Sequence, residues 1–254
     1  MGRLLGLIVA VAVLALGGGP ARAASPFGNW AAIFVAADNH AHSGAPSEVF
    51  DNARRDLATA FVRAGFSPGN VEQFSTHPSD YPGQKLMLSM PDVIGGELDR
   101  LATQARGGCL VYLTSHGAPD GIIVLTSSYF TSAGLAQVVD EACGDRPTVI
   151  VVSACFSGAF IAPLSRPNRM VMTAARPDRT SFGCGESDKY TFFDTCMLQQ
   201  LPQAHDFPAL GRAVQACVAK RESDMGLSPP SEPQVWIGPA LAPDLPLLAF
   251  AAPP

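Results

Sequence analysis

The sequence predicts a three-layer α/β sandwich with a mainly parallel central sheet. Short apolar runs rich in β-branched residues alternate with longer segments whose apolar residues recur at helical spacing, which is typical of strands joined by crossover helices. The runs at 109–115 and 148–153 are apolar along most of their length, as strands buried on both faces of a parallel sheet are. A chain of 254 residues can bury one substantial core, so we expect a single domain over residues 24–254.

The elements follow one another from a first strand expected at residues 30–37. A helix then runs from Pro46-Ser47 to about Ala64, with Gly65 at its end. The further elements are strands at 71–75, 109–115, 122–125, 148–153, 169–174 and 235–237, loops at 76–90 and 175–188, and helices at 91–106, 132–142, 190–201 and 207–222. A Pro/Ala-rich tail at about 239–254 is expected to be peripheral or flexible.

The charge pattern argues against a nucleic-acid partner. The formal net charge is -5 at pH 7, and no cluster of lysine and arginine extends beyond short pairs such as Arg54-Arg55. A nucleic-acid-binding surface needs a basic patch or stripe. We therefore expect no nucleic acid among the partners.

The first residues have the pattern of a secretory signal peptide. A basic start precedes an apolar segment at 4–16, then Gly17–Pro20 break the helix and Ala21-Arg22-Ala23 supplies a small-x-small cleavage site. We predict a signal peptide at 1–23, a secreted or periplasmic protein, and no stable membrane span after its removal. An uncleaved anchor is the alternative, but the segment is short for a span of ~20 residues.

Six cysteines in an exported chain make disulfides possible. If Cys155 has to stay a thiol, one of the other five must also be unpaired or bridged between molecules. We expect Cys109 and Cys143 to be buried small hydrophobic residues. One bridge is expected among the last three cysteines, Cys184, Cys196 and Cys217.

Two of the predicted buried strands end in residues with catalytic chemistry. The run at 148–153 leads to Cys155, and the run at 109–115 leads to His116 and Gly117. If the two strands are parallel neighbours, these residues meet at the sheet edge where α/β folds bind ligands. A thiol beside an imidazole indicates nucleophilic catalysis, and a helix beginning right after Cys155 would favour the thiolate. The backbone N–H groups of Gly117 and Cys155 could hold an oxyanion.

The same segments carry a family resemblance. The segments Thr-Ser-His-Gly at 114–117 and Ser-Ala-Cys-Phe-Ser-Gly at 153–158 resemble the His-Gly and Ala-Cys-x-Ser-Gly motifs of legumain-like cysteine peptidases, the asparaginyl endopeptidases of the caspase-like clan. The segment 172–184 is similar to the part of that family that builds the specificity pocket. The resemblance extends from about residue 30 to 201 and is to a bacterial member of the family.

The resemblance implies a caspase-like fold and a cysteine endopeptidase. With the signal pattern, we expect this enzyme to be exported, and we expect no cofactor or metal. The resemblance assigns His116 and Cys155 to the dyad and Gly117 to the oxyanion hole, with a peptide or protein as substrate, cut after asparagine or aspartate through a thioester.

The resemblance also places Ser181 in the specificity pocket and Asp194 close to the pocket carboxylate of the family. We also expect Ser153, His40 and Asn39 at the substrate, the last two because their loop leaves the same sheet edge. Ser153 stands where animal and plant members carry an acidic residue, so this chain departs from their pocket.

The loop after the first strand leaves other interpretations open. Asn39 or Asp38 could orient His116, and the loop could contact the substrate. The pair His40 and His42 beside Asp38 could instead bind zinc in a metal-dependent hydrolase, although no third ligand is evident. A non-catalytic caspase-like binding module is a further alternative. The sequence leaves the oligomeric state open.

Overall fold

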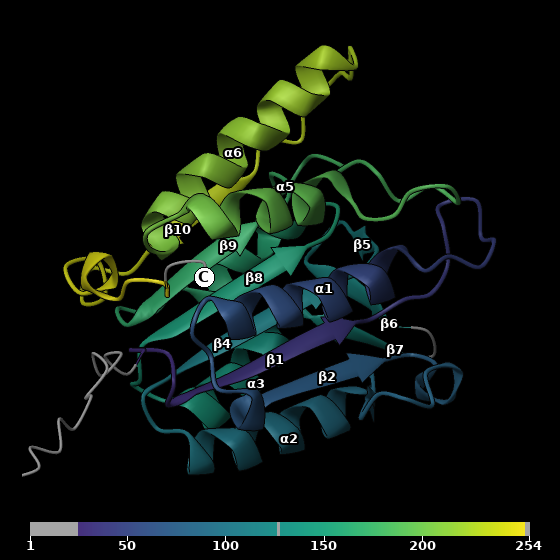
Figure 1. Ribbon diagram of the computed structural model, residues 1–254. Helices are drawn as coiled ribbons and strands as arrows, with labels where there is room; N and C mark the ends of the chain where they lie inside the picture. Colours follow the sequence, from purple (N-terminus) through teal and green to yellow (C-terminus); the bar gives the residue numbers. More distant parts are fainter. Residues whose placement is uncertain (1–24, 126–127, 252–254) are drawn as a thin grey trace, which may run out of the picture.

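The computed structural model describes residues 25–125 and 128–251, and a mainly parallel sheet forms its middle (Figure 1). The predicted signal peptide at 1–23 lies outside the described residues. In the described ranges the sheet has seven strands in the order β10-β9-β8-β4-β1-β2-β3. Their bounds in chain order are Trp30–Ala36 for β1, Val71–Ser75 for β2, Met87–Leu88 for β3, Gly108–Thr114 for β4, Thr148–Ser153 for β8, Arg169–Thr173 for β9 and Gln234–Ile237 for β10.

All neighbouring strands of this sheet run parallel except the edge strand β10, which is antiparallel to β9. The chain leaves β1 toward β2 on one side and later returns to β4 on the other side. The order therefore reverses between β1 and β4, which is where open α/β sheets form a crevice at their carboxyl edge. A small antiparallel sheet follows β4, with β5 at Gly117–Ala118, β6 at Ile122–Leu125 and β7 at Ser128–Thr131.

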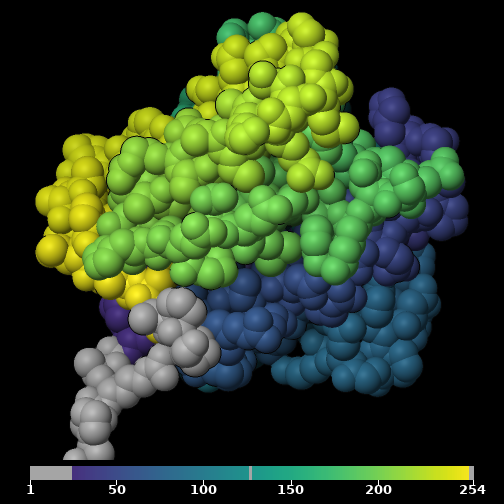
Figure 2. Space-filling model, turned by 45° about the horizontal axis from the view of Figure 1, so that its top comes forward, coloured from purple at the N-terminus to yellow at the C-terminus, as the bar shows by residue number. Residues whose placement is uncertain are grey.

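Helices cover both faces of the sheet, which confirms the predicted three-layer sandwich (Figure 1). One face carries α1 (Val49–Arg63), α5 (Phe192–Gln200) and α6 (Phe207–Asp224). The other carries α2 (Pro91–Gln104), α3 (Ser132–Cys143) and α4 (Ile161–Leu164). Figure 2 shows the surface over α5 and α6, coloured green to yellow-green. Short 3-10 turns lie at Pro68–Asn70 (η1), Pro78–Asp80 (η2), Ser157–Phe160 (η3), Leu201–Gln203 (η4) and Leu245–Leu247 (η5).

Side chains of the central strands alternate between the two helical layers. In β4, Leu110 and Tyr112 join the core under α1 and α5, whereas Val111 and Leu113 join the core under α2 and α3. Burying an apolar side chain of this size contributes about 1.5–3 kcal/mol. An all-apolar strand is thus stable only in the middle layer, which is why the runs noted in the sequence become β4 and β8.

An aromatic cluster closes the amino edge of the sheet. Phe27 stacks on Phe66 at 4.9 Å between ring centroids, and Phe207 contacts Phe250 at the same distance. The tail was expected to be peripheral or flexible, but its described part packs here, with Leu241 and Leu245 nearly or fully buried. Apolar residues spaced among the prolines account for this difference.

Two disulfides join the helices to their surroundings. Cys109 at the start of β4 is bonded to Cys143 at the end of α3, and Cys196 on α5 is bonded to Cys217 on α6. The expectation that Cys109 and Cys143 are unbonded hydrophobic residues is therefore wrong, because both reach the amino edge on one face of the sheet. The second bridge lies among the three cysteines from which one was expected, and it leaves Cys184 free.

Two local features differ from the sequence-based expectations. The segment at 76–90 contains η2 and β3, which pairs with β2. The residues after Cys155 form the 3-10 turn η3 and then the short α4, so no long helix begins at the thiol.

In the described ranges, no helix has the length and apolar character needed to cross a bilayer.

Candidate active site

Four neighbouring strands, β9, β8, β4 and β1, send their following loops to the carboxyl edge of the sheet (Figure 1). Thr114 of β4 pairs with Ser153 of β8, and the Ser115 N–H donates to the Ser153 carbonyl at 3.1 Å. His116 and Cys155 each lie two positions beyond this pair. The register of the two strands therefore brings the predicted base and nucleophile to the same level of one edge.

Cys155 is free and half-buried. The Ser181 N–H donates to its sulfur at 3.3 Å, and the Ser181 hydroxyl oxygen lies 3.6 Å from the same atom. The next residue, Phe156, adopts a left-handed conformation with φ 56°, and its N–H donates to the Arg179 carbonyl at 2.8 Å. The loop after β9 thus holds both the thiol and the turn that follows it, at a backbone conformation costly for a non-glycine residue.

His116 is held on both sides. Its Nε2 lies 3.0 Å from the His40 carbonyl oxygen, and its ring meets the Phe50 ring edge-on at 5.1 Å. Because a carbonyl oxygen only accepts, Nε2 must carry the hydrogen, which leaves Nδ1 of the neutral ring available as a base. The His116 carbonyl also accepts from the Val124 N–H at 3.0 Å, so the hairpin after β4 fixes the backbone here.

Asp38 organises the loop that contacts His116. Its buried carboxylate accepts from the N–H of Asn39 at 2.7 Å, from the N–H of His40 at 3.1 Å and from Nδ1 of His40 at 2.8 Å. These bonds orient the peptide group whose carbonyl binds His116. The His40 backbone carbonyl is thus the group next to Nε2 of the imidazole, and Asp38 acts on it through the loop.

Gly117 brings the loops that bear His116 and Cys155 into direct contact. A Cβ placed on this residue would lie 2.1 Å from the Cys155 carbonyl oxygen and 3.0 Å from Cβ of Ala154. The first distance is far below any van der Waals separation and involves backbone, which cannot move aside cheaply. A glycine at this position therefore allows the loops of β4 and β8 to touch.

Ser153 and Asp194, both expected at the substrate, lie beneath the surface. Asp194 on α5 is fully buried and accepts from the Tyr112 hydroxyl and from the Thr114 hydroxyl, both at 2.6 Å. The Ser153 hydroxyl lies 3.3 Å from that of Thr191. Burial raises the pKa of Asp194 above its ordinary value, although the surrounding hydroxyls oppose the shift. Contact of either residue with substrate stays a prediction.

Cys184, which the sequence analysis assigned to a possible bridge, is a second free cysteine beside the candidate site. It is half-buried and packs against Ala36, Val49 and Phe50, and its carbonyl accepts from the His42 N–H at 3.0 Å. The pKa of the Cys184 thiol is raised to about 11, mainly by burial and to a smaller extent by the charge of Cys155. The second free thiol is therefore protonated at neutral pH.

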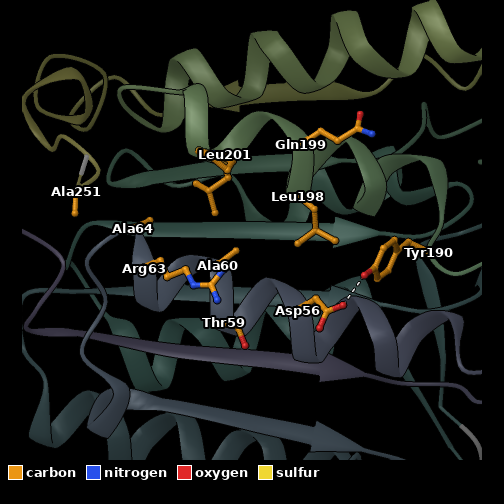
Figure 3. Close-up of a pocket in the computed structure, with 11 residues that line it drawn as sticks. Asp56, Thr59, Ala60, Arg63, Ala64, Tyr190, Leu198, Gln199, Leu201 and Ala251 are labelled. Atoms are coloured by element: carbon orange, nitrogen blue, oxygen red, sulfur yellow. Dashed lines mark hydrogen bonds between the residues drawn. The ribbon is translucent and has the colours of Figure 1, made fainter. Parts of the chain in front are cut away.

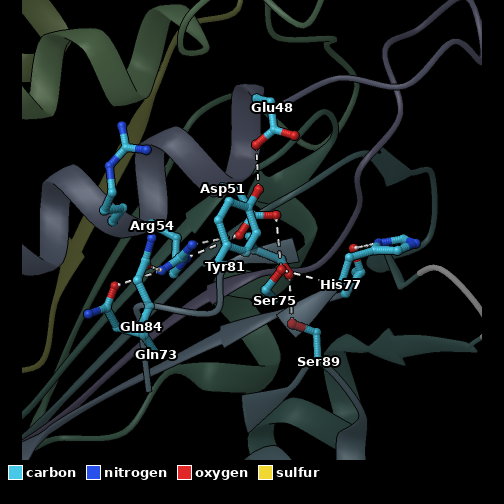
Figure 4. A network of polar contacts seen from close by, with 12 residues as sticks. Glu48, Asp51, Arg54, Gln73, Ser75, His77, Tyr81, Gln84 and Ser89 are labelled. Atoms are coloured by element: carbon cyan, nitrogen blue, oxygen red, sulfur yellow. Dashed lines mark hydrogen bonds and ion pairs between the residues drawn. The ribbon is translucent and has the colours of Figure 1, made fainter. Parts of the chain in front are cut away.

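A buried polar network anchors the first turns of α1 beside the site (Figure 4). Arg54 and Asp51 form an ion pair of 2.8 Å, and both side chains are almost fully buried. Their further partners are Gln73, Gln84 and Ser75. Burial raises the pKa of Asp51 despite the neighbouring guanidinium. The network fixes the start of α1, and with it Phe50, the residue that packs on the imidazole.

A separate groove of about 760 Å³ lies between α1 and the segment from α5 to η4 (Figure 3). Its polar lining includes Asp56 and Tyr190, which are hydrogen-bonded to each other, together with Arg63 and Gln199. None of the predicted site residues lines it. The candidate active site is thus a different place, at the carboxyl edge of the sheet.

The loop after β1 contains the residues that the sequence analysis considered as possible zinc ligands. Nδ1 of His40 is bound to Asp38, and the His42 ring lies 6.5 Å from the His116 ring, measured between centroids. Within residues 25–125 and 128–251, no three His, Cys, Asp or Glu side chains are grouped so as to hold a metal ion. This loop instead contacts His116 and Cys184.

A free thiol and an imidazole on adjoining strand ends of an α/β sandwich are features of the cysteine peptidase class. A family model described as "Peptidase C13 family" matches residues 67–216, which is more than half of the chain and includes both residues. The chain belongs to this family, the legumain family, and is a cysteine endopeptidase whose substrates are peptides or proteins. Family membership decides against the metal-dependent hydrolase and the non-catalytic binding module.

The fold agrees with this family. The crystal structure of caspase-1 from Spodoptera frugiperda is similar, with a TM-score of 0.60 and 16% sequence identity over 90% of this chain and 94% of that chain. At this identity the likeness concerns the fold alone, and it confirms the caspase-like sandwich. A comparison with curated proteins found no match.

Proposed function

We propose that His116 and Cys155 form the catalytic dyad of this endopeptidase and that cleavage proceeds through a thioester. The observation that carries the proposal is the contact between Gly117 and the Cys155 carbonyl, because it joins the loops that bear the base and the nucleophile. The free, half-buried state of Cys155 and the tautomer imposed on His116 support the same assignment.

In the first half-reaction, the Cys155 thiolate attacks the carbonyl carbon of the scissile peptide bond. The negative charge develops on the substrate oxygen, which the backbone N–H groups of Gly117 and Cys155 stabilise. His116 carries the proton from the thiol on Nδ1 and gives it to the leaving amine, so the C–N bond breaks and the thioester remains. The first product leaves as a free amine.

In the second half-reaction, water attacks the thioester carbon while His116 accepts a proton from it. The C–S bond breaks, the acid product leaves, and Cys155 returns to its starting state. The link from Nε2 to the His40 carbonyl keeps the ring in place through both steps, and it becomes stronger when the ring is protonated.

The substrate residue on the acyl side is expected to be asparagine or aspartate, as in the family that the chain resembles. Ser181 supports a pocket next to the nucleophile, because its hydroxyl and N–H both approach the sulfur. Asn39 and His40 are half-exposed on the loop after β1 and are proposed to contact the substrate as well.

Export to an oxidising compartment is also proposed. The signal pattern at 1–23 supports it, and so do the two disulfides, since such bonds persist in secreted and periplasmic proteins. N-terminal sequencing of the exported protein should begin at Ala24. An exported chain that still begins at Met1 would contradict cleavage of a signal peptide.

The activity can be tested with a library of fluorogenic peptides that differ in the acyl-side residue. The wild-type protein should cleave peptides with asparagine or aspartate at this position, and Cys155→Ala should cleave none. Cys184→Ala is the matched control, because it removes the neighbouring free thiol and should leave cleavage in place. Turnover by Cys155→Ala would exclude the proposed nucleophile, and cleavage only after other residues would exclude the proposed preference.

A further inference from the structure

A buried carboxylate lies under the two strand ends that bear the dyad. Asp194 has no exposed surface, and its two oxygens accept from different residues of β4, the hydroxyls of Tyr112 and Thr114. The Ser153 hydroxyl of β8 lies 3.3 Å from that of Thr191, which in turn accepts from the Asp194 N–H. The start of α5 therefore connects the carboxyl ends of both strands, with the Asp194 carboxylate contacting β4 and Thr191 contacting β8.

The connected residues occupy matching places in the two strands. Thr114 and Ser153 are paired in the sheet, and each precedes its catalytic residue by two positions. On the helix side, Thr191 caps α5 by accepting from the Asp194 N–H at 3.1 Å. The Thr191 hydroxyl also lies beside that of Ser153. The two strand ends and the start of α5 thus belong to one hydrogen-bonded cluster.

A buried polar cluster of this kind often stabilises a protein core less well than apolar packing does. Burying a carboxylate costs free energy unless its hydrogen bonds compensate, and apolar residues of similar volume are often at least as stable in such places. None of the ion pairs of the described residues provides a cation for Asp194. Directed hydrogen bonds, however, fix the orientation of the groups that they join, and apolar packing does not.

We propose that Asp194 is a positioning residue of the peptidase, which holds the ends of β4 and β8 so that His116 and Cys155 meet the substrate in reactive geometry. The proposal rests on the dyad proposed above. Misplacing a reacting group by about 1 Å can lower the rate about 100-fold, whereas binding of the rest of a substrate is less sensitive. The proposal therefore predicts a loss in kcat and not in KM.

The test compares four variants of the full-length protein. Asp194→Ala removes both acceptors, and Asp194→Asn keeps one carbonyl oxygen at nearly the same place. Thr114→Val removes only one hydroxyl from the cluster and keeps the shape of the side chain. Asp140→Asn is the matched control, because it weakens the tie to the buried Arg169 at the opposite edge of the sheet. For each variant we would measure kcat, KM, acyl-side preference and melting temperature.

The expected result is a fall in kcat of about 100-fold for Asp194→Ala with KM and preference unchanged. Thr114→Val should lower kcat about 10-fold, and Asp194→Asn should recover most of the loss. Asp140→Asn should lower the melting temperature without lowering kcat. If Asp194→Ala does not fold, the same comparison is made with Thr114→Val and Asp194→Asn.

Two results would overturn the proposal. A raised KM or an altered acyl-side preference with kcat unchanged would make Asp194 a substrate-binding residue. An unchanged kcat in a folded variant would make the cluster merely structural. Failure of the dyad itself would look different, because Cys155→Ala would then still cleave peptides in the same assay.

Discussion

The two ends of the strand pair β4 and β8 carry cysteines in opposite states. Cys109 begins β4 at the amino edge, where it is fully buried and bonded to Cys143. Cys155 follows β8 at the carboxyl edge, where it is free and half-buried. Both lie in or next to apolar runs of similar composition. The direction of the strand, and not the local sequence, separates the disulfide-bonded cysteine from the proposed nucleophile.

The amino and carboxyl edges of the sheet also differ in the residues around these cysteines. The amino edge is closed by the aromatic cluster around Phe27 and Phe207 and by the disulfide of Cys109. The carboxyl edge has polar loops, a left-handed Phe156 and a backbone contact at Gly117. The amino edge is stabilised by buried rings and a disulfide, and the proposed dyad lies at the carboxyl edge, so changes at the two edges should affect different measurements.

The largest expected effect on stability is at the amino edge. Phe207→Ala removes a fully buried ring that contacts Phe27, Phe61 and Phe250 and should lower the free energy of unfolding by about 3–5 kcal/mol. Urea-induced unfolding measures this change, and kcat of the folded variant should stay close to that of the wild type. Leu247→Ala is the control, since Leu247 is 77% exposed and its loss should cost less than about 0.5 kcal/mol.

The next largest effect is a loss of peptide cleavage that is expected only from changes at the carboxyl edge. Gly117→Ala forces the loops of β4 and β8 apart and disturbs a proposed oxyanion donor, so kcat/KM should fall about 100- to 1,000-fold, or about 2.7–4 kcal/mol. The control is Gly69→Ala, because a Cβ at Gly69 meets nothing within 4 Å. Equal activity of the two variants in a peptide-cleavage assay would show that the loop contact is not needed for the reaction.

The disulfide at the amino edge should contribute somewhat less to the free energy of unfolding than Phe207 does. The double variant Cys109→Ala and Cys143→Ala, which opens a link across 34 residues, should lose about 2–4 kcal/mol of stability. Thermal unfolding measures the loss, while cleavage at low temperature should be retained. A stable but inactive double variant would contradict the separation of the two edges.

The smallest effect is a change in how stability depends on pH. Burial raises the pKa of Asp194, so its contribution to stability is fully present below the ordinary aspartate pKa and is lost as pH rises through the raised value. Wild-type stability relative to Asp194→Asn should therefore decrease as pH rises above the ordinary aspartate pKa. Urea titrations at several pH values measure the difference. Parallel curves for the two proteins would contradict the raised pKa.

Much of the fold could be predicted because local patterns determine it. The ranges predicted for β2, β6 and β8 agree with the structure. The segments of β6 and β8 are short runs rich in apolar, β-branched residues, with clear breaks before and after them. The strands β3 and β5 span only two residues each and form because of their partners, which local sequence does not reveal. Pairing of Cys109 with Cys143 depends on tertiary structure in the same way.

The site could be predicted only in part for related reasons. His116 and Cys155 follow long buried strands, so their shared edge follows from the parallel order of β4 and β8. The partner of His116 is the carbonyl of His40, and a backbone group has no signal in the sequence. The depth of Asp194 below the surface depends on how α5 packs against β4, which no motif records.

The central claim is that Cys155 is the nucleophile of a dyad at the carboxyl edge, and its alkylation tests this most directly. The protein would be treated with increasing amounts of iodoacetamide at neutral pH, with modification of each cysteine followed by mass spectrometry and peptide cleavage measured in the same samples. The account predicts that activity falls in proportion to modification of Cys155, while Cys184, whose pKa is about 11, reacts far more slowly. Full activity in protein whose Cys155 is completely alkylated would contradict it.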